Sequence, residues 1–134
     1  MGYASPAGTF DKKYNIFQLI GELRRGVSED TTVYSATHNL NDVSSYLLVF
    51  QLKVADVRDS ARFKIGIDGV YGYGSGATSS LTYVPFCLGR TVDLTGMNGL
   101  HDIDLVFDHS SGAFGWKYVK DVSMTFLTNG VVNP

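Results

Sequence analysis

Alternation between apolar and polar residues is the feature of this sequence that most limits its fold. From Tyr46 to Val54 every second residue is apolar, beginning with Tyr46, and Gln51 and Lys53 lie between them. Side chains at alternate positions of a β-strand share one face, so a period of two marks a strand with one buried face. This segment is therefore predicted to be a core strand.

Similar short segments occur along the rest of the chain. Segments with this period, or with many strand-forming residues, cover residues 31–36, 63–67, 81–86, 101–107 and 119–127. Residues 14–25 fit either a strand or a helix, and Gly21 within them favours the strand. Regularly spaced short strands without a long amphipathic helix predict an all-β fold, an antiparallel β-sandwich of the jelly-roll type.

Glycine-rich stretches separate the predicted strands. The pair Asp68-Gly69 is a hairpin turn signal, and residues 69–80 are expected to form a long glycine- and serine-rich loop. Further along, Val92 and Leu94 are expected to form a short strand before a tight glycine turn. The second strand of this unit is the segment that begins at His101.

The length and the ends of the chain indicate one domain. A chain of 134 residues is long enough to bury most of its apolar surface in a single core, so residues 1–134 are expected to form one sandwich. The composition of residues 1–9 and 129–134 is typical of a linker or loose arm.

Charge and composition argue against two classes of partner. The formal net charge is -2, and no basic run is longer than the Arg24–Arg25 pair, so no nucleic-acid partner is expected. No apolar stretch approaches membrane-spanning length, so no membrane insertion is expected either.

The sequence contains a single cysteine, Cys87, and therefore no intramolecular disulfide. Its neighbours Phe86 and Leu88 are apolar, and no basic residue adjoins it. A small apolar-like residue in such a context is usually buried, so an unreactive buried thiol is predicted.

The densest group of polar side chains consists of His101, Asp102, Asp104, Asp108 and His109. A metal site or an acid–base pair is one interpretation. Adjacent residues of a strand face opposite sides, so His101 and Asp102 converge on one ion only where a bulge interrupts the strand. A structural role is therefore favoured. Because no nucleophile–base pair stands out, the chain is not expected to be an enzyme.

Three stretches in the later part of the chain carry a resemblance to a known family. They read FQLKVADVRDSARFKIGIDG (residues 50–69), VDLTGMNGLHDIDLVF (92–107) and YVKDVSMTF (118–126). The first ends in an Ile-Asp-Gly turn, the second has a Gly-x-His-Asp turn before a strand ending in Val-Phe, and the third is a final core strand. In this pattern residues 46–126 resemble family 6-type carbohydrate-binding modules.

The resemblance implies a galactose-binding-like β-sandwich without catalytic activity. Such modules hold oligo- or polysaccharides, usually beside a glycoside hydrolase domain. Many also hold a structural calcium ion, and the resemblance places Glu22 and Asp121 in that role. The tryptophan and asparagine of the family's sugar site fall near Phe86–Cys87 and Lys120, where this sequence has other residue types.

Aromatic residues in and beside the glycine-rich loops are the candidates for a sugar site. A flat ring stacks on the apolar face of a sugar, and polar neighbours bond to the hydroxyls at its edge. The alternative, held equally open, is that Tyr71 and Tyr73 cap the core and Trp116 fills one end of the sandwich. Lys117 and Lys120 are expected to donate to ring hydroxyls or to the carboxylate or phosphate of an acidic glycan. The expected ligand-binding residues are Tyr71, Tyr73, Tyr83, Phe114, Trp116, Tyr118 and Lys120.

The sequence therefore predicts a non-catalytic module that recognises a saccharide through loop aromatics. The alternative is a structural or receptor-recognition jelly-roll domain of a viral or phage particle, whose partners are other particle subunits. An extracellular or particle-surface location is favoured in both cases, although the sequence shows no secretory signal.

Overall fold

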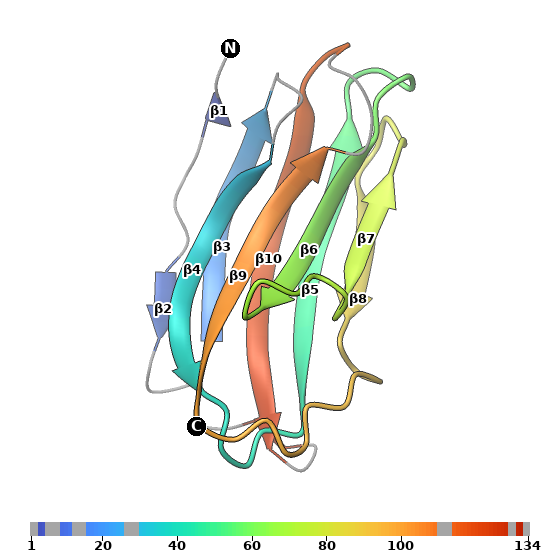
Figure 1. Cartoon of the computed structure of the whole chain (residues 1–134). Helices are drawn as coiled ribbons and strands as arrows, with labels where there is room; N and C mark the ends of the chain where they lie inside the picture. Colours follow the sequence, from blue (N-terminus) through green and yellow to red (C-terminus); the bar gives the residue numbers. More distant parts are fainter. Residues whose placement is uncertain are drawn as a thin grey trace.

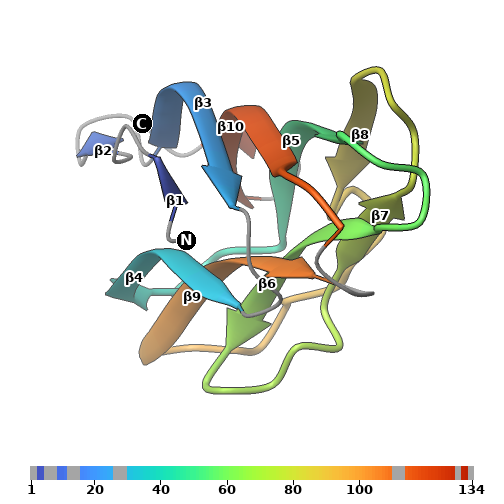
Figure 2. The same ribbon diagram turned by 90° about the horizontal axis from the view of Figure 1, so that it is seen from above.

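The fold is a sandwich of two β-sheets. The computed structural model describes the backbone of residues 3–4, 9–11, 16–25, 30–109, 114–128 and 131–132, and the side chains of residues 30–107 and 114–128. Within these ranges every regular element is a strand, so none of them forms a membrane-spanning helix. Figure 2 shows the two sheets as separate layers. The predicted all-β antiparallel sandwich is confirmed.

The larger sheet has seven strands among the described residues, in the order β1-β3-β10-β5-β8, with β2 beside β3 and β11 beside β10. These strands are β1 (Tyr3–Ala4), β2 (Thr9–Asp11), β3 (Ile16–Arg25), β5 (Ser45–Val54), β8 (Val84–Leu88), β10 (Lys117–Thr128) and β11 (Val131–Val132). The smaller sheet has the order β4-β9-β6-β7 (Figure 1). Its strands are β4 (Thr31–Asn39), β6 (Ala61–Ile67), β7 (Ser75–Thr78) and β9 (Leu100–His109).

The core lies between the sheets and is filled by the alternating residues of the predicted strands. The five apolar residues of β5 that alternate from Tyr46 to Val54 are each at most 1% exposed. Phe50 of the larger sheet packs against Phe63 of the smaller one, with ring centroids 5.0 Å apart, and stacks on Phe86 at 5.1 Å. This aromatic contact joins the two layers. It stabilises the folded chain because it removes apolar area from water.

The predicted loop over residues 69–80 contains a strand, β7, which the sequence did not indicate. Gly76 lies opposite Phe63 in the pairing of β7 with β6. A Cβ atom at Gly76 would lie 2.6 Å from a carbon of Phe86 and 3.0 Å from one of Phe50. The glycines suggested a loop, but this one lets the strand approach the core rings closely.

The turn predicted at Asp68-Gly69 is confirmed. Both residues have positive φ, 53° and 79°, as a two-residue hairpin turn of type I′ requires. Ile67 and Val70, on either side, exchange backbone hydrogen bonds of 2.9 and 3.0 Å.

The short strand predicted at Val92 and Leu94 is not a strand. The backbone there turns, with Val92 N–H donating to the Gly89 carbonyl and Leu94 N–H to the Ser44 carbonyl, both at 2.9 Å. Leu94 is nevertheless fully buried, at 0% exposure. Its side chain closes the end of the core from a loop. An apolar residue was therefore needed at this position although it belongs to no strand.

The prediction of a buried Cys87 is wrong. Cys87 is exposed, because Phe86 and Leu88 point toward the core and strand alternation turns the residue between them outward. The segments expected as linkers also contain paired residues: Tyr3 and Ala4 pair with β3, Thr9 belongs to β2, and β11 pairs with β10. The remaining residues of those segments lie outside the described ones.

Candidate functional site

A group of tyrosines and lysines lies on the outward face of the larger sheet. We call Lys53, Tyr83, Tyr118 and Lys120 the tyrosine–lysine face. Tyr118 of β10 pairs with Lys53 of β5. On its other side β5 pairs with β8, where Leu52 lies opposite Val84, the residue after Tyr83. Lys117 and Val119 are buried, so Tyr118 and Lys120 point to the other side of the sheet.

Within this face the ammonium groups lie over the aromatic rings. Lys53 Nζ is 4.6 Å from the ring centroid of Tyr118 and 5.0 Å from that of Tyr83. Lys120 Nζ is 4.2 Å from the Tyr83 centroid. An ammonium at this distance is attracted by the negative face of the ring. The face therefore combines two partly exposed rings with two cations held in place by them.

A β-bulge sets the edge of the tyrosine–lysine face. The pairing of β10 with β5 shifts between Lys120 and Ser123, where β10 has one residue more than β5, and Asp121 in this interval has φ of 54°. The Gln51 amide Nε2 donates to the Asp121 carboxylate at 2.8 Å. An amide and a carboxylate thus lie beside the rings, where they can bond to hydroxyl groups.

Asp121 was also expected to be a calcium ligand, together with Glu22. Calcium takes six to eight oxygen ligands, and among the described residues no three His, Cys, Asp or Glu side chains lie close enough to hold a metal. Asp121 follows the cationic Lys120 and already accepts from Gln51. The backbone of Glu22 pairs with Lys120, but its side chain lies outside the described ones. Calcium therefore stays a prediction for this chain.

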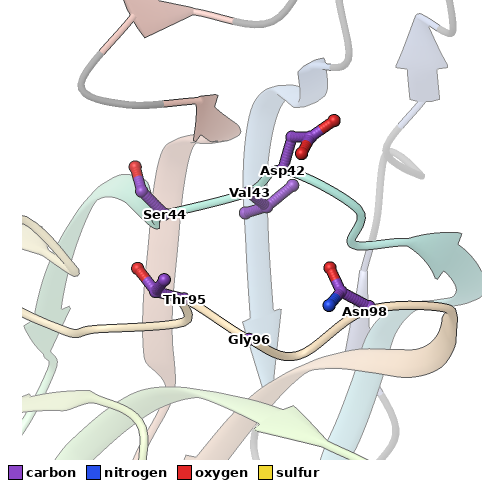
Figure 3. Close-up of a pocket in the computed structure, with 6 residues that line it drawn as sticks. All are labelled: Asp42, Val43, Ser44, Thr95, Gly96 and Asn98. Carbon is purple, nitrogen blue, oxygen red and sulfur yellow. The ribbon is translucent and has the colours of Figure 1, made fainter.

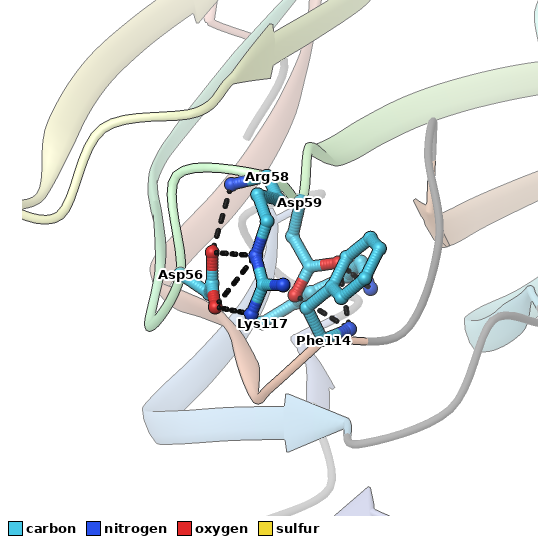
Figure 4. Close-up of polar contacts among 5 residues, drawn as sticks. All are labelled: Asp56, Arg58, Asp59, Phe114 and Lys117. Atoms are coloured by element: carbon cyan, nitrogen blue, oxygen red, sulfur yellow. Dashed lines mark hydrogen bonds and ion pairs between the residues drawn. The ribbon is translucent and has the colours of Figure 1, made fainter.

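A buried ion pair holds the start of β10 (Figure 4). Lys117 Nζ lies 3.6 Å from Asp59 Oδ1, and both residues are 1% exposed. The Phe114 N–H donates to both carboxylate oxygens of Asp59, at 3.0 and 3.2 Å. Lys117 was expected to be a sugar donor, and its burial in this pair shows that expectation to be wrong. It anchors the strand from which Tyr118 and Lys120 project.

Beside this pair, Asp56 and Arg58 form a surface ion pair, also drawn in Figure 4. The Arg58 side chain and backbone N–H donate to Asp56 and lower the pKa of its carboxyl group to about 2. The Arg58 guanidinium lies 4.2 Å from the Phe114 ring centroid. Phe114 is 52% exposed, and its ring lies against Arg58 in the loop after β5.

The other predicted aromatics lie elsewhere in the molecule. Tyr71 lies on the outward face of the smaller sheet, across Gly66 and near Lys64 Nζ, 4.7 Å from its ring. Tyr73 packs against the core, and its carbonyl accepts a hydrogen bond of 2.6 Å from Tyr46. Trp116 is partly buried and accepts from Ala55 N–H at 2.9 Å through its carbonyl. Of the predicted ligand-binding residues, the structure brings together Tyr83, Tyr118 and Lys120.

Sequence reasoning missed Lys53 and Gln51. Both lie on the outward side of the clearest predicted strand, so their orientation was readable from its period. What the sequence did not show was the register, which places Lys53 beside Tyr118 and Gln51 beside Lys120.

A small polar pocket lies near the start of β5, at the end of the sandwich opposite to Lys53 (Figure 3). It has a volume of about 280 Å³ and lies between the loop after β4 and the loop before β9. Its lining residues are Asp42, Val43, Ser44, Thr95, Gly96 and Asn98. The lining offers hydroxyl, amide and carboxylate groups but no ring, so it lacks a surface on which a sugar could stack.

Of the polar group first considered as a metal site, His101, Asp102 and Asp104 make structural hydrogen bonds, and the side chains of Asp108 and His109 lie outside the described ones. His101 Nδ1 lies 2.6 Å from Asp68 Oδ2, and its Nε2 lies 3.1 Å from the Asn98 carbonyl. The hydrogen bond to Asp68 raises the pKa of His101. On the other side of β9, Asp102 accepts from Thr37 and Asp104 from Ser35. The alternating side chains diverge, as the period predicted.

Comparison with known proteins gives the fold a context. No protein-family model matches the sequence, and no curated protein matches it. The structure is similar to the CBM36-1 domain of a multidomain xylanase from the hindgut metagenome of Trinervitermes trinervoides, with a TM-score of 0.54 and 13% identity. That alignment covers 92% of this chain and 88% of the other.

Two further solved structures have a similar fold. The sugar-binding C-terminal domain of EclA has a TM-score of 0.51 at 10% identity, covering 78% of this chain and 77% of that one. A CBM4 structure has a TM-score of 0.52 at 12% identity, covering 89% and 77%. None of the three is a particle protein, so they lend the viral alternative no support, and they do not single out family 6. The chain has the β-sandwich fold of carbohydrate-binding modules.

Proposed function

We propose that this chain is a non-catalytic carbohydrate-binding module that holds a saccharide on the tyrosine–lysine face. The observation that carries the proposal is the row formed by Tyr83, Lys53 and Tyr118, which presents two rings and an ammonium group on one outward surface. Its fold, shared with solved carbohydrate-binding modules, supports the proposal.

The spacing of the row suits a chain of sugars. Tyr118 pairs with Lys53 on one side, and Tyr83 directly precedes β8 on the other side, next to the pair formed by Val84 and Leu52. Two strand spacings separate β10 from β8, so the backbones of the two tyrosines are about 10 Å apart. Each ring can stack on the apolar face of one sugar unit, and successive units can reach both rings. Lys53, Lys120, Gln51 and Asp121 supply donors and acceptors for the hydroxyl groups.

The partners follow from this proposal. A binding module of this kind concentrates an enzyme on its substrate, and the similar CBM36-1 domain belongs to a multidomain xylanase. We therefore propose an oligo- or polysaccharide as ligand, a linked glycoside hydrolase as neighbour and an extracellular location.

Calcium is not needed for binding in this proposal, because no step depends on a metal. The sequence-based prediction of a structural calcium ion is checked separately, by measuring the thermal midpoint with calcium and with a chelator. An ion that binds only the folded chain raises its stability. An unchanged midpoint would contradict the prediction of a structural calcium ion.

The test of the site is alanine substitution at the rings. Tyr83→Ala and Tyr118→Ala should each weaken polysaccharide binding by about 1–3 kcal/mol, which is what burying such a ring supplies. Tyr71→Ala is the matched control, because Tyr71 is an exposed tyrosine under a lysine on the other sheet. Binding is measured by affinity electrophoresis against a panel of polysaccharides, with thermal midpoints to check folding.

The outcome separates this site from the wider set predicted from the sequence. Weaker binding on loss of Tyr71, with Tyr83 and Tyr118 dispensable, would move the site to the smaller sheet. Failure of every polysaccharide to bind would overturn the proposed function.

A further inference from the structure

We infer that the saccharide bound by the tyrosine–lysine face is anionic, with carboxylate or sulfate groups that Lys53 and Lys120 recognise. This inference rests on the proposed function and specifies its ligand class.

The first observation is that these two lysines lack an anionic partner among the described side chains. Among the described side chains neither Lys53 nor Lys120 forms an ion pair; the contacts of each ammonium are with tyrosine rings. The nearby Asp121 carboxylate accepts from the Gln51 amide instead. No described carboxylate therefore neutralises the charge of either side chain.

The other lysines with described side chains are paired. Lys64 Nζ lies 3.7 Å from Asp30 Oδ2, and Lys117 Nζ lies 3.6 Å from Asp59 Oδ1. Lys64 also lies over the ring of Tyr71, so it has both a tyrosine ring and the Asp30 carboxylate as partners. The absence of a carboxylate partner among the described side chains thus distinguishes the tyrosine–lysine face from a comparable lysine–tyrosine contact on the other sheet.

The second observation is the placement of the two charges. Lys53 pairs with Tyr118 and Lys120 pairs with Gln51, so the lysines are diagonal neighbours on adjacent strands, with Cα atoms about 7–8 Å apart. Both ammonium groups lie over the Tyr83 ring, at 5.0 and 4.2 Å. Two like charges so close together repel each other, and an anion between or beside them relieves that repulsion.

The third observation is that the attraction is local. The formal net charge of the chain is -2, so the protein as a whole does not attract polyanions. An anionic polymer would bind where cations and stacking rings occur together. The rings read the sugar and the ammonium groups read its acidic substituent, which a neutral glycan lacks.

The test compares acidic polymers with matched neutral ones, using the full chain. Polygalacturonate is compared with its methyl ester for the carboxylate, and dextran sulfate with dextran for the sulfate. We expect at least one acidic polymer to bind more tightly than its neutral counterpart. Raising the ionic strength from about 0.01 to 0.15 M should weaken that binding, because the screening length falls from about 30 to 8 Å.

Neutral lysine variants identify the charges. Lys53→Gln and Lys120→Gln should each reduce affinity for the acidic polymer about 10- to 100-fold, the range for losing a hydrogen bond to a charged group. Affinity for a neutral polymer should hardly change. Lys64→Gln is the matched control and should leave both affinities unchanged. Thermal midpoints show whether each variant is folded.

Each result decides the inference. Equal affinity for acidic and neutral polymers, insensitive to salt and to both lysine variants, would overturn the anionic ligand and leave the proposed function standing. If salt weakens binding but Lys64→Gln and Lys53→Gln lower the affinity equally, the attraction depends on overall charge and not on the tyrosine–lysine face. That result would also overturn the inference. No binding to any polymer would overturn the proposed function together with the inference.

Discussion

The two outward faces of the sandwich use similar residues in different ways. On the smaller sheet Lys64 pairs with Asp30, Ser35 donates to Asp104 at 2.6 Å, and Thr37 donates to Asp102 at 2.8 Å. On the larger sheet Lys53 and Lys120 contact rings and lack a described carboxylate partner. A face whose polar groups satisfy one another has little to offer a ligand. The partners of a residue, more than its type, therefore distinguish a binding face from a structural one.

The largest effect should come from the support beneath the tyrosine–lysine face. Lys117→Met leaves the Asp59 carboxylate buried without its cation, which typically costs about 3–5 kcal/mol of unfolding free energy. Lys64→Met on the other face breaks a partly exposed pair and should cost about 1 kcal/mol or less. Urea denaturation measures both. Equal losses would mean that the two ion pairs support their faces equally.

A smaller effect is expected from the carboxylates of the smaller sheet. Asp102→Ala and Asp104→Ala remove exposed hydrogen bonds, so each should cost at most about 1 kcal/mol of stability. Saccharide affinity should be unchanged, since neither residue lies on the larger sheet. A clear loss of affinity in either variant, measured alongside Tyr83→Ala, would break the comparison between the faces.

The pH dependence of stability should be smaller still, because two histidines of the smaller sheet act in opposite directions. Burial lowers the pKa of His38, so its contribution to stability is lost as pH falls below the unfolded value of about 6.5. Asp68 raises the pKa of His101, so its contribution is present below that value and is lost as pH rises through the folded pKa.

His101→Gln separates the two effects. The variant should lose more stability relative to the unmodified chain at about pH 5.5 than at about pH 8, because protonated His101 stabilises the folded chain through Asp68 only at the lower pH. Urea midpoints at the two pH values check this. A loss that is equal at both would mean that protonation of His101 does not contribute.

The last prediction concerns reactivity and involves no change in stability. Because Cys87 is exposed on the larger sheet, a thiol reagent should modify it in the native protein about as fast as in urea. The measurement is a time course with a chromogenic disulfide. Protection in the native state would place the thiol in the core and return to the sequence-based prediction.

The sequence predicted those features that depend on local periodicity. The inward residues of β5 and the Asp68-Gly69 turn needed only a period of two and the backbone angles of the turn. Cys87 was misjudged because its neighbours in sequence were taken for its neighbours in space. Leu94 was misjudged because a buried leucine in a loop has the same sequence signal as one in a strand.

The candidate site depended on pairings between distant strands. Tyr83, Tyr118 and Lys120 were named as aromatics and donors, but nothing in the sequence separated them from Tyr71 or Phe114. That separation comes from the register of β10 with β5, and so does the position of Lys53. The burial of Lys117 depends on Asp59, which lies 58 residues earlier in the chain.

The bulge at Asp121 has a consequence for changes in chain length. Before it the odd-numbered residues Lys117 and Val119 face inward, and after it the even-numbered Val122 and Met124 do so. A single-residue deletion within a strand normally turns one half of the strand inside out. Deleting Asp121 restores regular alternation instead, so every inward side chain of β10 keeps its side. The central strand of the larger sheet therefore has a place where it can become one residue shorter without exchanging its two faces.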